Sequence, residues 1–375
     1  MSGSFKFLEK FTTKLNFGKS ITLKRHSYQL KRHQSTISHL QSNITDNEFV
    51  SPAVNIFPIF IKDLTENSVF EKEPDFKMRY QRMIEYSLLV GNKEVPCMTV
   101  MCYKTLERPE KLNEETINQA YLLGWLGEMI QSIMYMASDK INNVETRNNS
   151  KTWHSLDDVG LLVANDTCLL QTSIFILLKK YFKDHPNYPR FIELFHSCLY
   201  TTFQGHNLEL ISKDINGFHM NVIERIAKYK IATGCFNWPL KCAVYLANLD
   251  PTHYLDQGRN IIEEIAVYKK IKADFLDSFG NHPQHVNIKQ GYCSWLAVKL
   301  LETCNSNQQT SFKENYGKIG ENSIDEVISL YNAVKLPVLF ETYKIKKNVD
   351  ITKKIGLIED EDVKRCLTNF WNQTF

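Results

Sequence analysis

The chain has 375 residues, 43% of them apolar, 23% charged and 12% aromatic, so it can build a large packed core, and disordered and fibrous proteins are excluded. Its formal net charge is +3, but residues 1–45 hold eight basic residues and one acid, Glu9, so the rest of the chain is net negative. That sign excludes binding to a nucleic acid backbone, which needs a net basic face.

Residues 1–45 form a basic leader. They are rich in Ser, Thr, Lys and Arg and mildly amphipathic around Phe5, Leu8, Phe11 and Leu15. This composition is typical of an organellar transit peptide, and a disordered basic tail is the alternative. The apolar core of a secretory signal is missing. We therefore expect a mitochondrial or cytoplasmic protein with a single domain over residues 46–375.

From about Pro74 onward, apolar residues recur at spacings of three and four, which predicts helices. The 15 glycines and 11 prolines do not gather into the turn signals that regularly spaced strands need. The predicted helices cover residues 78–89, 113–142, 158–182, 188–210, 222–248, 254–279, 293–303, 324–343 and 359–371. Since no repeat or linker follows residue 60, they predict one all-α domain built as a helical bundle.

The sequence shows neither a membrane span nor a pattern of structural cysteines. The longest apolar stretch, residues 168–178, is shorter than the ~20 residues of a span and contains polar side chains. The nine cysteines include no CxxC pair, which predicts buried free thiols. His282 and His285 flank Pro283 in a predicted loop without further ligands nearby, so a solvated pair is favoured over a metal site.

Two predicted helices end in acidic residues that could bind a cation. Asp139 lies near the end of helix 113–142, and Asn142 follows on the same face. Asp274 and Asp277, spaced i and i+3, share a face of helix 254–279. If these helices face each other, their oxygens could hold hard cations such as Mg²⁺. A solvated acid or a helix cap is the more common alternative for each.

The segments around these acids resemble the short-chain isoprenyl diphosphate synthases, particularly farnesyl diphosphate synthase. IQSIMYMASDKIN followed by NVETRNNSKTW resembles the family's first DDxxD helix and arginine loop, AKYKIATGCFNWP its KYKT helix, and KKIKADFLDSFG its second aspartate motif. EYSLLVGNK, CSWLAV and KENYG also fit, in the family's order. The resemblance covers residues 60–375. It implies an all-α isoprenoid synthase fold, a homodimer, and magnesium held between the two motifs.

Both aspartate motifs depart from the family pattern. Ser138 replaces the leading aspartate of the first motif, and Ala273 replaces that of the second. The resemblance implies that the remaining oxygen ligands for Mg²⁺ are Asp139, Asn142, Asp274 and Asp277. It also implies that Arg147 and Lys230 grip the diphosphate, and that these two cations act in catalysis with Asp139 and Asp277. Lys270 and Lys272 replace glutamines beside the second motif and could add positive charge, or face solvent.

The side that would hold isopentenyl diphosphate has changed more. Lys93 aligns with the lysine of the family's GGK motif, but Pro96 stands where an arginine follows it. Asn148 replaces the second of the paired arginines, and Tyr292 replaces a loop lysine. Because bidentate arginine contacts bind diphosphate most strongly, these changes predict the loss of the isopentenyl diphosphate site.

The same kind of loss is known in insect terpene synthases, which resemble farnesyl diphosphate synthases. The resemblance therefore implies a class I terpene synthase that ionises an allylic prenyl diphosphate, expected to be farnesyl diphosphate, with Mg²⁺ and releases a sesquiterpene and diphosphate. The expected substrate contacts are Arg147, Lys230, Lys93, Gln131, Phe203 and Trp238, although a place in the core is the alternative for each aromatic ring. Glu209 is a candidate magnesium contact through water or a proton acceptor. A chain-elongating prenyltransferase, or a non-catalytic partner subunit of one, is the alternative function.

Overall fold

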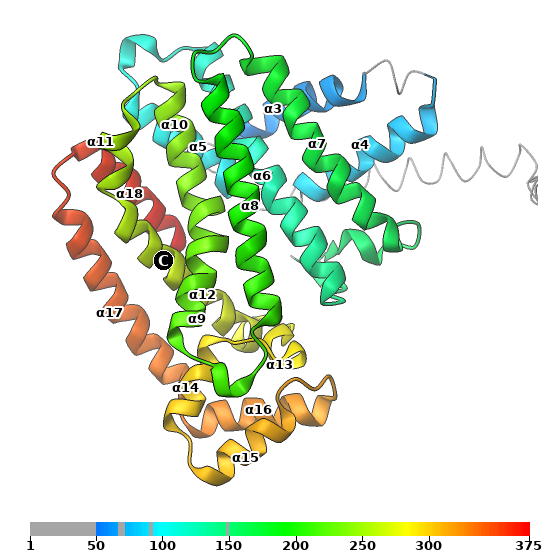
Figure 1. The fold of residues 1–375 in the computed structure, drawn as a ribbon, viewed down its shortest axis with the longest axis vertical. Coiled ribbons are helices and arrows are strands. Elements are labelled where there is room, and N and C mark those ends of the chain that lie inside the picture. Colours follow the sequence, from blue (N-terminus) through cyan, green and yellow to red (C-terminus); the bar gives the residue numbers. More distant parts are fainter. Residues whose placement is uncertain (1–49, 67–71, 90–92, 148–149) are drawn as a thin grey trace, which may run out of the picture. The chain divides into compact units, whose positions relative to one another are not determined.

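The structure is a computed structural model that describes residues 50–66, 72–89, 93–147 and 150–375. Residues Asp46–Phe375 form one compact unit. Helices make up most of the described chain (Figure 1), so the prediction of an all-α fold is confirmed. The basic leader and Asn148, on which two of the sequence predictions rest, lie outside the described residues.

The α-helices follow one another with short connections. They are α3 (Val50–Thr65), α4 (Pro74–Leu89), α5 (Glu94–Leu106), α6 (Glu114–Ile141), α7 (Val163–Phe182), α8 (Tyr188–Ile211), α9 (Met220–Ile226), α10 (Trp238–Leu246), α11 (Pro251–Asp256), α12 (Arg259–Phe279), α13 (Val286–Gln290), α14 (Trp295–Thr303), α15 (Ser306–Asn315), α16 (Glu321–Ala333), α17 (Leu336–Gly356) and α18 (Glu361–Thr374). Short 3₁₀ turns are η1 (Pro109–Lys111), η2 (Trp153–Ser155), η3 (Gly160–Leu162) and η4 (Ile215–Gly217), and η5 (Ala227–Asn237) is a π-helix. In the described residues, β-structure is limited to the antiparallel pair β1 (Thr146–Arg147) and β2 (Ser150–Lys151).

The helix that carries the first motif illustrates how closely sequence signals match the structure. Helix α6 begins after Asn113, whose side chain accepts from the N–H of Thr116, while the Thr116 hydroxyl accepts from the N–H of Asn113. This reciprocal capping box satisfies two backbone donors at the helix start. Asn142 caps the other end. The predicted range of 113–142 thus coincides with the helix and its two caps.

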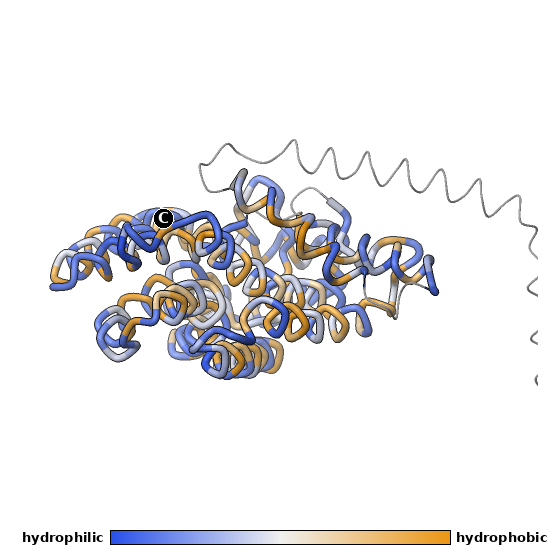
Figure 2. Tube along the Cα trace, turned by 90° about the horizontal axis from the view of Figure 1, so that it is seen from above, coloured by the Kyte–Doolittle hydropathy of each residue, from blue (hydrophilic) through white to orange (hydrophobic). Residues whose placement is uncertain are grey.

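Two hydrophobic clusters form the core. The larger joins residues of α3 to α8, η5, α10, α12, α17 and α18, and the smaller joins residues of α9, α12 to α17. Helix α12 belongs to both, since it gives Ile265 and Tyr268 to the larger cluster and Ile271 to the smaller. Each helix carries hydrophobic and hydrophilic residues in alternation (Figure 2), so the clusters are built from one side of most helices.

Among the described helices, the segment Gly160–Phe182 is long and apolar enough to cross a membrane by length and composition. Core helices of other proteins pass the same test, so this is weak support for a span. Within the segment, Asp166 is buried and forms an ion pair with Arg79 at 2.6 Å, and its carboxylate also accepts from the Trp153 indole N–H. These contacts tie α7 to the rest of the fold.

Candidate active site

The first motif is held by an arginine from the short β-hairpin. Asp139, near the end of α6, is buried, and its carboxylate accepts from Arg147 Nη2 at 2.5 Å and from Nε at 3.2 Å. The Arg147 guanidinium also lies over the ring of Tyr135, 4.7 Å from its centroid. The pairing of β1 with β2 fixes the backbone of Arg147. Asp139 and Arg147, both predicted site residues, are therefore direct partners.

The second motif lies opposite the first. Burial acts to lower the pKa of Arg147, but Asp139, Tyr135 and Asp277 outweigh it, so the pKa is raised. The hydroxyl of Tyr292, in the loop after α13, donates to Asn142 Oδ1 at 2.6 Å. The end of α6 is therefore in direct contact with the segment that follows the second motif, as a shared cation site would require.

Asp274 is used inside the protein. It is 2% exposed, and its Oδ1 accepts from Lys270 Nζ at 2.5 Å and from Asn287 Nδ2 at 3.2 Å. Its Oδ2 accepts from the backbone N–H of Trp295, the first residue of α14, at 3.1 Å. The carboxylate therefore ties the start of α14 to α12.

Asp277 has a similar structural role at the next helix. Its two carboxylate oxygens accept from the backbone N–H groups of Val286 and Asn287, at 3.0 and 2.9 Å. These residues begin α13, so the carboxylate satisfies donors that the helix itself leaves unpaired. Burial raises the pKa of Asp277, and the two N–H bonds oppose that shift.

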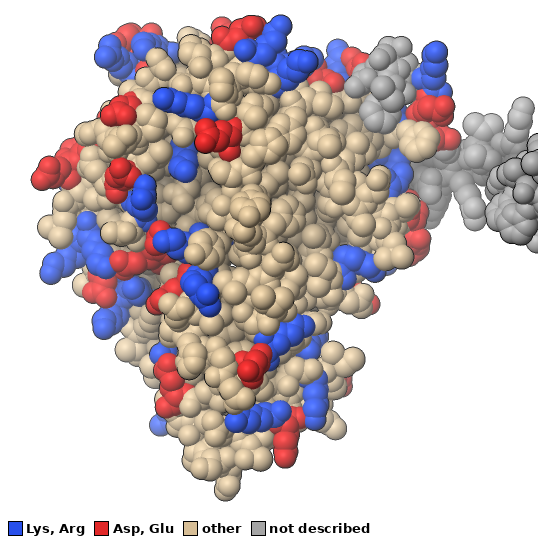
Figure 3. All heavy atoms as spheres, in the orientation of Figure 1, with Lys and Arg blue, Asp and Glu red and all other residues tan. Residues whose placement is uncertain are grey.

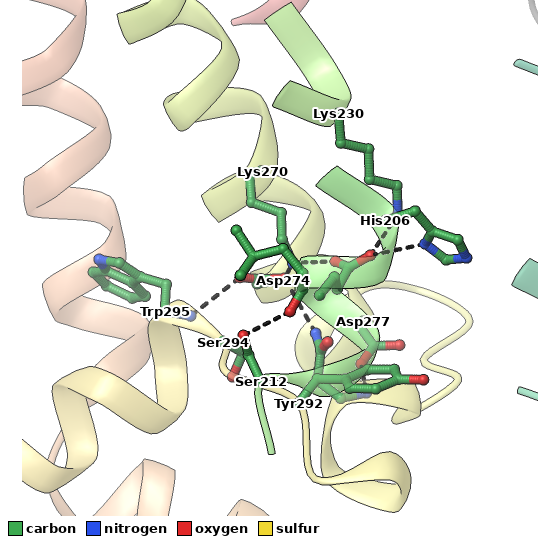
Figure 4. A network of polar contacts seen from close by, with 12 residues as sticks. His206, Ser212, Lys230, Lys270, Asp274, Asp277, Tyr292, Ser294 and Trp295 are labelled. Carbon is green, nitrogen blue, oxygen red and sulfur yellow. Dashed lines mark hydrogen bonds and ion pairs between the residues drawn. The ribbon is translucent and has the colours of Figure 1, made fainter. Parts of the chain in front are cut away.

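Four charged side chains form a series of ion pairs that begins at Asp274 of the second motif (Figure 4). Lys270 Nζ contacts Asp274 Oδ1 at 2.5 Å and Glu209 Oε1 at 3.0 Å, and Lys230 Nζ contacts Glu209 Oε2 at 2.5 Å. Burial would raise the pKa of Glu209, but the two lysines hold it well below its usual range. A carboxylate with so low a pKa is a poor proton acceptor, so this geometry does not favour that role for Glu209. Lys230, predicted to grip diphosphate, has Glu209 as its partner.

The two residues predicted to lie at the co-substrate site, Lys93 and Pro96, are both buried. Lys93 is 1% exposed, has a left-handed backbone (φ 60°) and donates from Nζ to the carbonyl oxygen of Leu89 at 2.9 Å. Burial lowers its pKa, and the charge of Glu128 opposes that shift. Pro96 is buried against α6, since a Cβ added to Gly124 would lie 2.4 Å from the Pro96 Cα.

Beside them lies an ion pair that the sequence analysis missed. Lys269 Nζ contacts Glu94 Oε2 at 2.5 Å, which joins α12 to the start of α5. The ammonium also lies 5.7 Å from the centroid of the Phe236 ring. The only sequence signal was the run of lysines before the second motif, because nothing in the spacing of Glu94 and Lys269 indicates that they meet.

The other predicted substrate contacts differ in their surroundings. Gln131 is half-buried and donates from Nε2 to Cys235 Sγ at 3.1 Å, and Phe203 is half-buried beside the larger cluster. Trp238 is 1% exposed within that cluster, and its indole N–H donates to the Leu123 carbonyl oxygen at 3.1 Å. Its position favours the core interpretation for Trp238.

The donor set fits a divalent cation poorly at the second motif. Among the residues that the structure describes, no group of three or more His, Cys, Asp or Glu side chains lies together as a metal site. Asp274 is already bound by the Lys270 ammonium, and Asp277 by two backbone N–H groups. The binding of Mg²⁺ by Asp139, Asn142, Asp274 and Asp277 stays a prediction.

Comparisons with known proteins identify the family. The sequence model of the polyprenyl synthetase family matches residues 77–334. Farnesyl pyrophosphate synthase 2 of Cannabis sativa is 30% identical over 318 residues, 82% of this chain and 93% of its own length. Farnesyl pyrophosphate synthase 1, mitochondrial, of Arabidopsis thaliana is 27% identical over 95% of this chain and 96% of its own. The structure of T. brucei farnesyl diphosphate synthase with risedronate superposes with a TM-score of 0.81 at 21% identity, covering 87% of this chain and 98% of its own, which shows the same fold.

Proposed function

Because the chain belongs to the polyprenyl synthetase family, we propose that it is an enzyme acting on prenyl diphosphates. The first step is heterolysis of the allylic carbon–oxygen bond, in which the electron pair leaves with the diphosphate and an allylic cation remains. Arg147 and Lys230 are the side chains proposed to stabilise the departing negative charge. Arg147 pairs with Asp139 of the first motif, and Lys230 belongs to the separate group of ion pairs that contains Asp274 of the second motif.

The relatives support one fate for that cation. Those reported above are named farnesyl pyrophosphate synthases, and they match this chain over nearly its whole length. Their names support a prenyltransferase, in which the carbon–carbon double bond of isopentenyl diphosphate captures the cation and a proton is then lost. Such a reaction needs a second diphosphate site with its own cations.

The co-substrate side of this chain supports a different fate. The single observation that carries it is the buried Lys93, whose ammonium donates to the Leu89 carbonyl while Pro96 packs on Gly124. Neither position offers a cation to a second diphosphate. We therefore propose a class I terpene synthase that acts on farnesyl diphosphate, in which the cation, with or without cyclisation, loses a proton to give a sesquiterpene hydrocarbon or is captured by water, which then loses a proton, to give an alcohol. Prenyl transfer is the second candidate.

The test is an incubation of the full chain in Mg²⁺ with geranyl or farnesyl diphosphate, in both double-bond geometries, with and without isopentenyl diphosphate. Headspace volatiles and diphosphate products are analysed separately. A hydrocarbon or alcohol formed without isopentenyl diphosphate supports the terpene synthase. Longer diphosphates formed only in its presence support prenyl transfer and overturn our interpretation of Lys93 and Pro96. Absence of both products would leave the non-catalytic partner subunit as the better explanation.

Three further proposals concern the whole protein. We propose a homodimer, Mg²⁺ as the metal at the first motif, and a catalytic domain over residues 46–375 preceded by a leader. The mitochondrial relative from Arabidopsis thaliana, which aligns with 95% of this chain, supports a mitochondrial location, and a cytoplasmic one is the alternative.

A further inference from the structure

The carboxylate of Asp274 in the second motif is paired with a cation of the protein, the ammonium group of Lys270. Lys270 and Asp274 are one helical turn apart on α12, and the Lys270 ammonium bridges the Asp274 carboxylate, at 2.5 Å, and that of Glu209 on α8, at 3.0 Å. In Figure 4 the Lys270 side chain points toward Asp274. Two carboxylates from different helices thus converge on one ammonium, where a bridging metal ion would otherwise be expected.

Burial makes the charge balance of this group decisive. Lys270 is 5% exposed, Asp274 2% and Glu209 9%, so bulk water cannot compensate an unpaired charge. With Lys230 on the other oxygen of Glu209, two ammonium groups meet two carboxylates, and the group is neutral. A divalent cation added to this group without an accompanying anion would leave two uncompensated positive charges in a buried site.

The ligand oxygens are also occupied. Asp274 Oδ1 accepts from Lys270 and Asn287, and Oδ2 accepts from the Trp295 N–H that begins α14. Both acceptor positions of Oδ1 are therefore used, and a metal ion could bind only at the remaining lone pair of Oδ2, close to the Lys270 ammonium, unless it displaced that ammonium. Lys272, two residues away, faces elsewhere and donates to the carbonyl oxygens of Thr374 and Phe375.

We propose that Lys270 replaces a divalent cation at the second motif, so that Asp274 and Glu209 bind no metal. The inference rests on the proposed function in that it concerns the same diphosphate site. Lys270 is a positioning residue here, since its ammonium holds Glu209 and, through Glu209, orients Lys230. Any metal that accompanies the diphosphate then lies on the side of the first motif.

The test counts bound metal without turnover. The full chain is saturated with inorganic pyrophosphate and titrated with Mn²⁺, and free Mn²⁺ is measured by electron paramagnetic resonance. We expect Lys270→Gln to bind one more Mn²⁺ per chain than the wild type. The matched control Lys272→Gln changes a lysine of the same helix outside the group and should bind the wild-type number. An equal count in Lys270→Gln and the wild type overturns the proposal.

Thermal unfolding gives a second readout. Without metal, Lys270→Gln leaves two buried carboxylates with one ammonium, which should lower Tm by about 5–10 °C. Mn²⁺ with pyrophosphate should raise the Tm of this variant by more than it raises that of Lys272→Gln, because only Lys270→Gln gains a further metal-binding position. An equal rise in the two variants speaks against the proposal.

If Lys270→Gln does not fold, a variant that removes the carboxylate and keeps the lysine tests the proposal. Asp274→Asn keeps the side-chain size, and we expect it to bind the same number of Mn²⁺ ions as the wild type. A count lower by one would identify Asp274 as a metal ligand and overturn the proposal. Because these counts need no product, a chain that fails to turn over farnesyl diphosphate can still give the expected numbers, so the two failures are distinguishable.

Discussion

At the scale of single residues, Arg147 connects most of the candidate site. It binds the carboxylate of Asp139 and stacks on Tyr135, and the charge of Asp277 contributes to raising its pKa. Its side chain remains 37% exposed, so the guanidinium still has donors available on its open side. A planar cation with five N–H donors suits a diphosphate better than a lysine would.

We predict that Arg147→Gln lowers kcat/KM for the allylic diphosphate about 100-fold, since the loss of charged hydrogen bonds costs roughly 1.5–3 kcal/mol each. Steady-state release of diphosphate is the measurement, with circular dichroism to check folding. Arg82→Gln is the matched control, because Arg82 pairs with Asp158 at the surface. Equal losses in both variants would assign Arg147 a structural role only.

Glu128 provides a pH-dependent test. Burial raises its pKa to about 7, against roughly 4.3 in the unfolded chain. The folded state therefore binds the proton more tightly, and the stability from this group is full below pH ~4.3 and is lost as pH rises to about 7.

Glu128→Gln, which cannot ionise, should escape that loss. From pH 5 to 7.5 its free energy of unfolding should gain about 2–3 kcal/mol relative to the wild type. Urea unfolding at four pH values measures the difference, with the exposed Glu110→Gln as control. A difference that does not change with pH would refute the assignment.

The sequence named candidate site residues but not the partners that the structure gives them. Asp139 was expected to bind a cation and Arg147 a diphosphate, and the structure pairs them with each other. The partners of Asp274 could not be predicted, because Trp295 and Asn287 reach it only through the path of the loop after α12. The burial of Lys93 depends in the same way on how α5 packs.

At the scale of elements, the π-helix η5 determines where Lys230 lies. It packs against α8 at Gly205, where an added Cβ would lie 2.6 Å from the Lys230 backbone nitrogen and 2.9 Å from the Tyr229 Cβ. The missing side chain lets Lys230 reach Glu209, which is on α8 one turn further along. The wider turns of a π-helix are often found at functional sites.

Gly205→Ala should force η5 away from α8. We expect it to lower the free energy of unfolding by about 1–3 kcal/mol through overpacking, and to reduce turnover by displacing Lys230. Gly234→Ala is the matched control, since its added Cβ would meet only the Thr202 hydroxyl at 3.9 Å. Urea denaturation and diphosphate release measure both. A Gly205→Ala chain as stable and active as Gly234→Ala would show that the close approach can relax freely.

The pattern of apolar residues predicted most helices with one buried face, although α3, which also has one, was not predicted. Helix α5 was not predicted because residues 95–100 are all buried, so the sequence shows no amphipathic period there. Helix α15 was not predicted because it is mostly polar. The predicted helix 324–343 is two helices, since Lys335 adopts a left-handed backbone (φ 57°) between α16 and α17. A polar residue in a turn of this kind gives no periodic signal.

At the scale of the molecule, the surface over α7 and α8 suits a partner chain. Figure 3 shows a broad area without charged residues on this face. Helices α7 and α8 also carry exposed apolar side chains, since Ile176 on α7 is 47% and Tyr200 on α8 is 68% exposed. Uncharged, apolar areas of this kind favour protein contacts, which supports the proposed homodimer.

The double variant Ile176→Glu, Tyr200→Glu should therefore sediment as a monomer while the wild type sediments as a dimer, because buried like charges oppose association. Val338→Glu, on the exposed side of α17, is the control and should leave the dimer intact. Sedimentation velocity over a range of concentrations is the measurement. A dimeric double variant would place the interface elsewhere.

The sharing of α12 between the two hydrophobic clusters has a consequence for local opening of the chain. Because α12 packs into both clusters, neither can unfold while the other keeps its native contacts, and we expect one cooperative unit in hydrogen exchange. The carboxylates of Asp274 and Asp277 then sit on a rigid support. Residues 280–294, which connect α12 to α14, are fixed to that support by the N–H groups of Val286 and Asn287 on Asp277, so an entering diphosphate meets a site that is already formed.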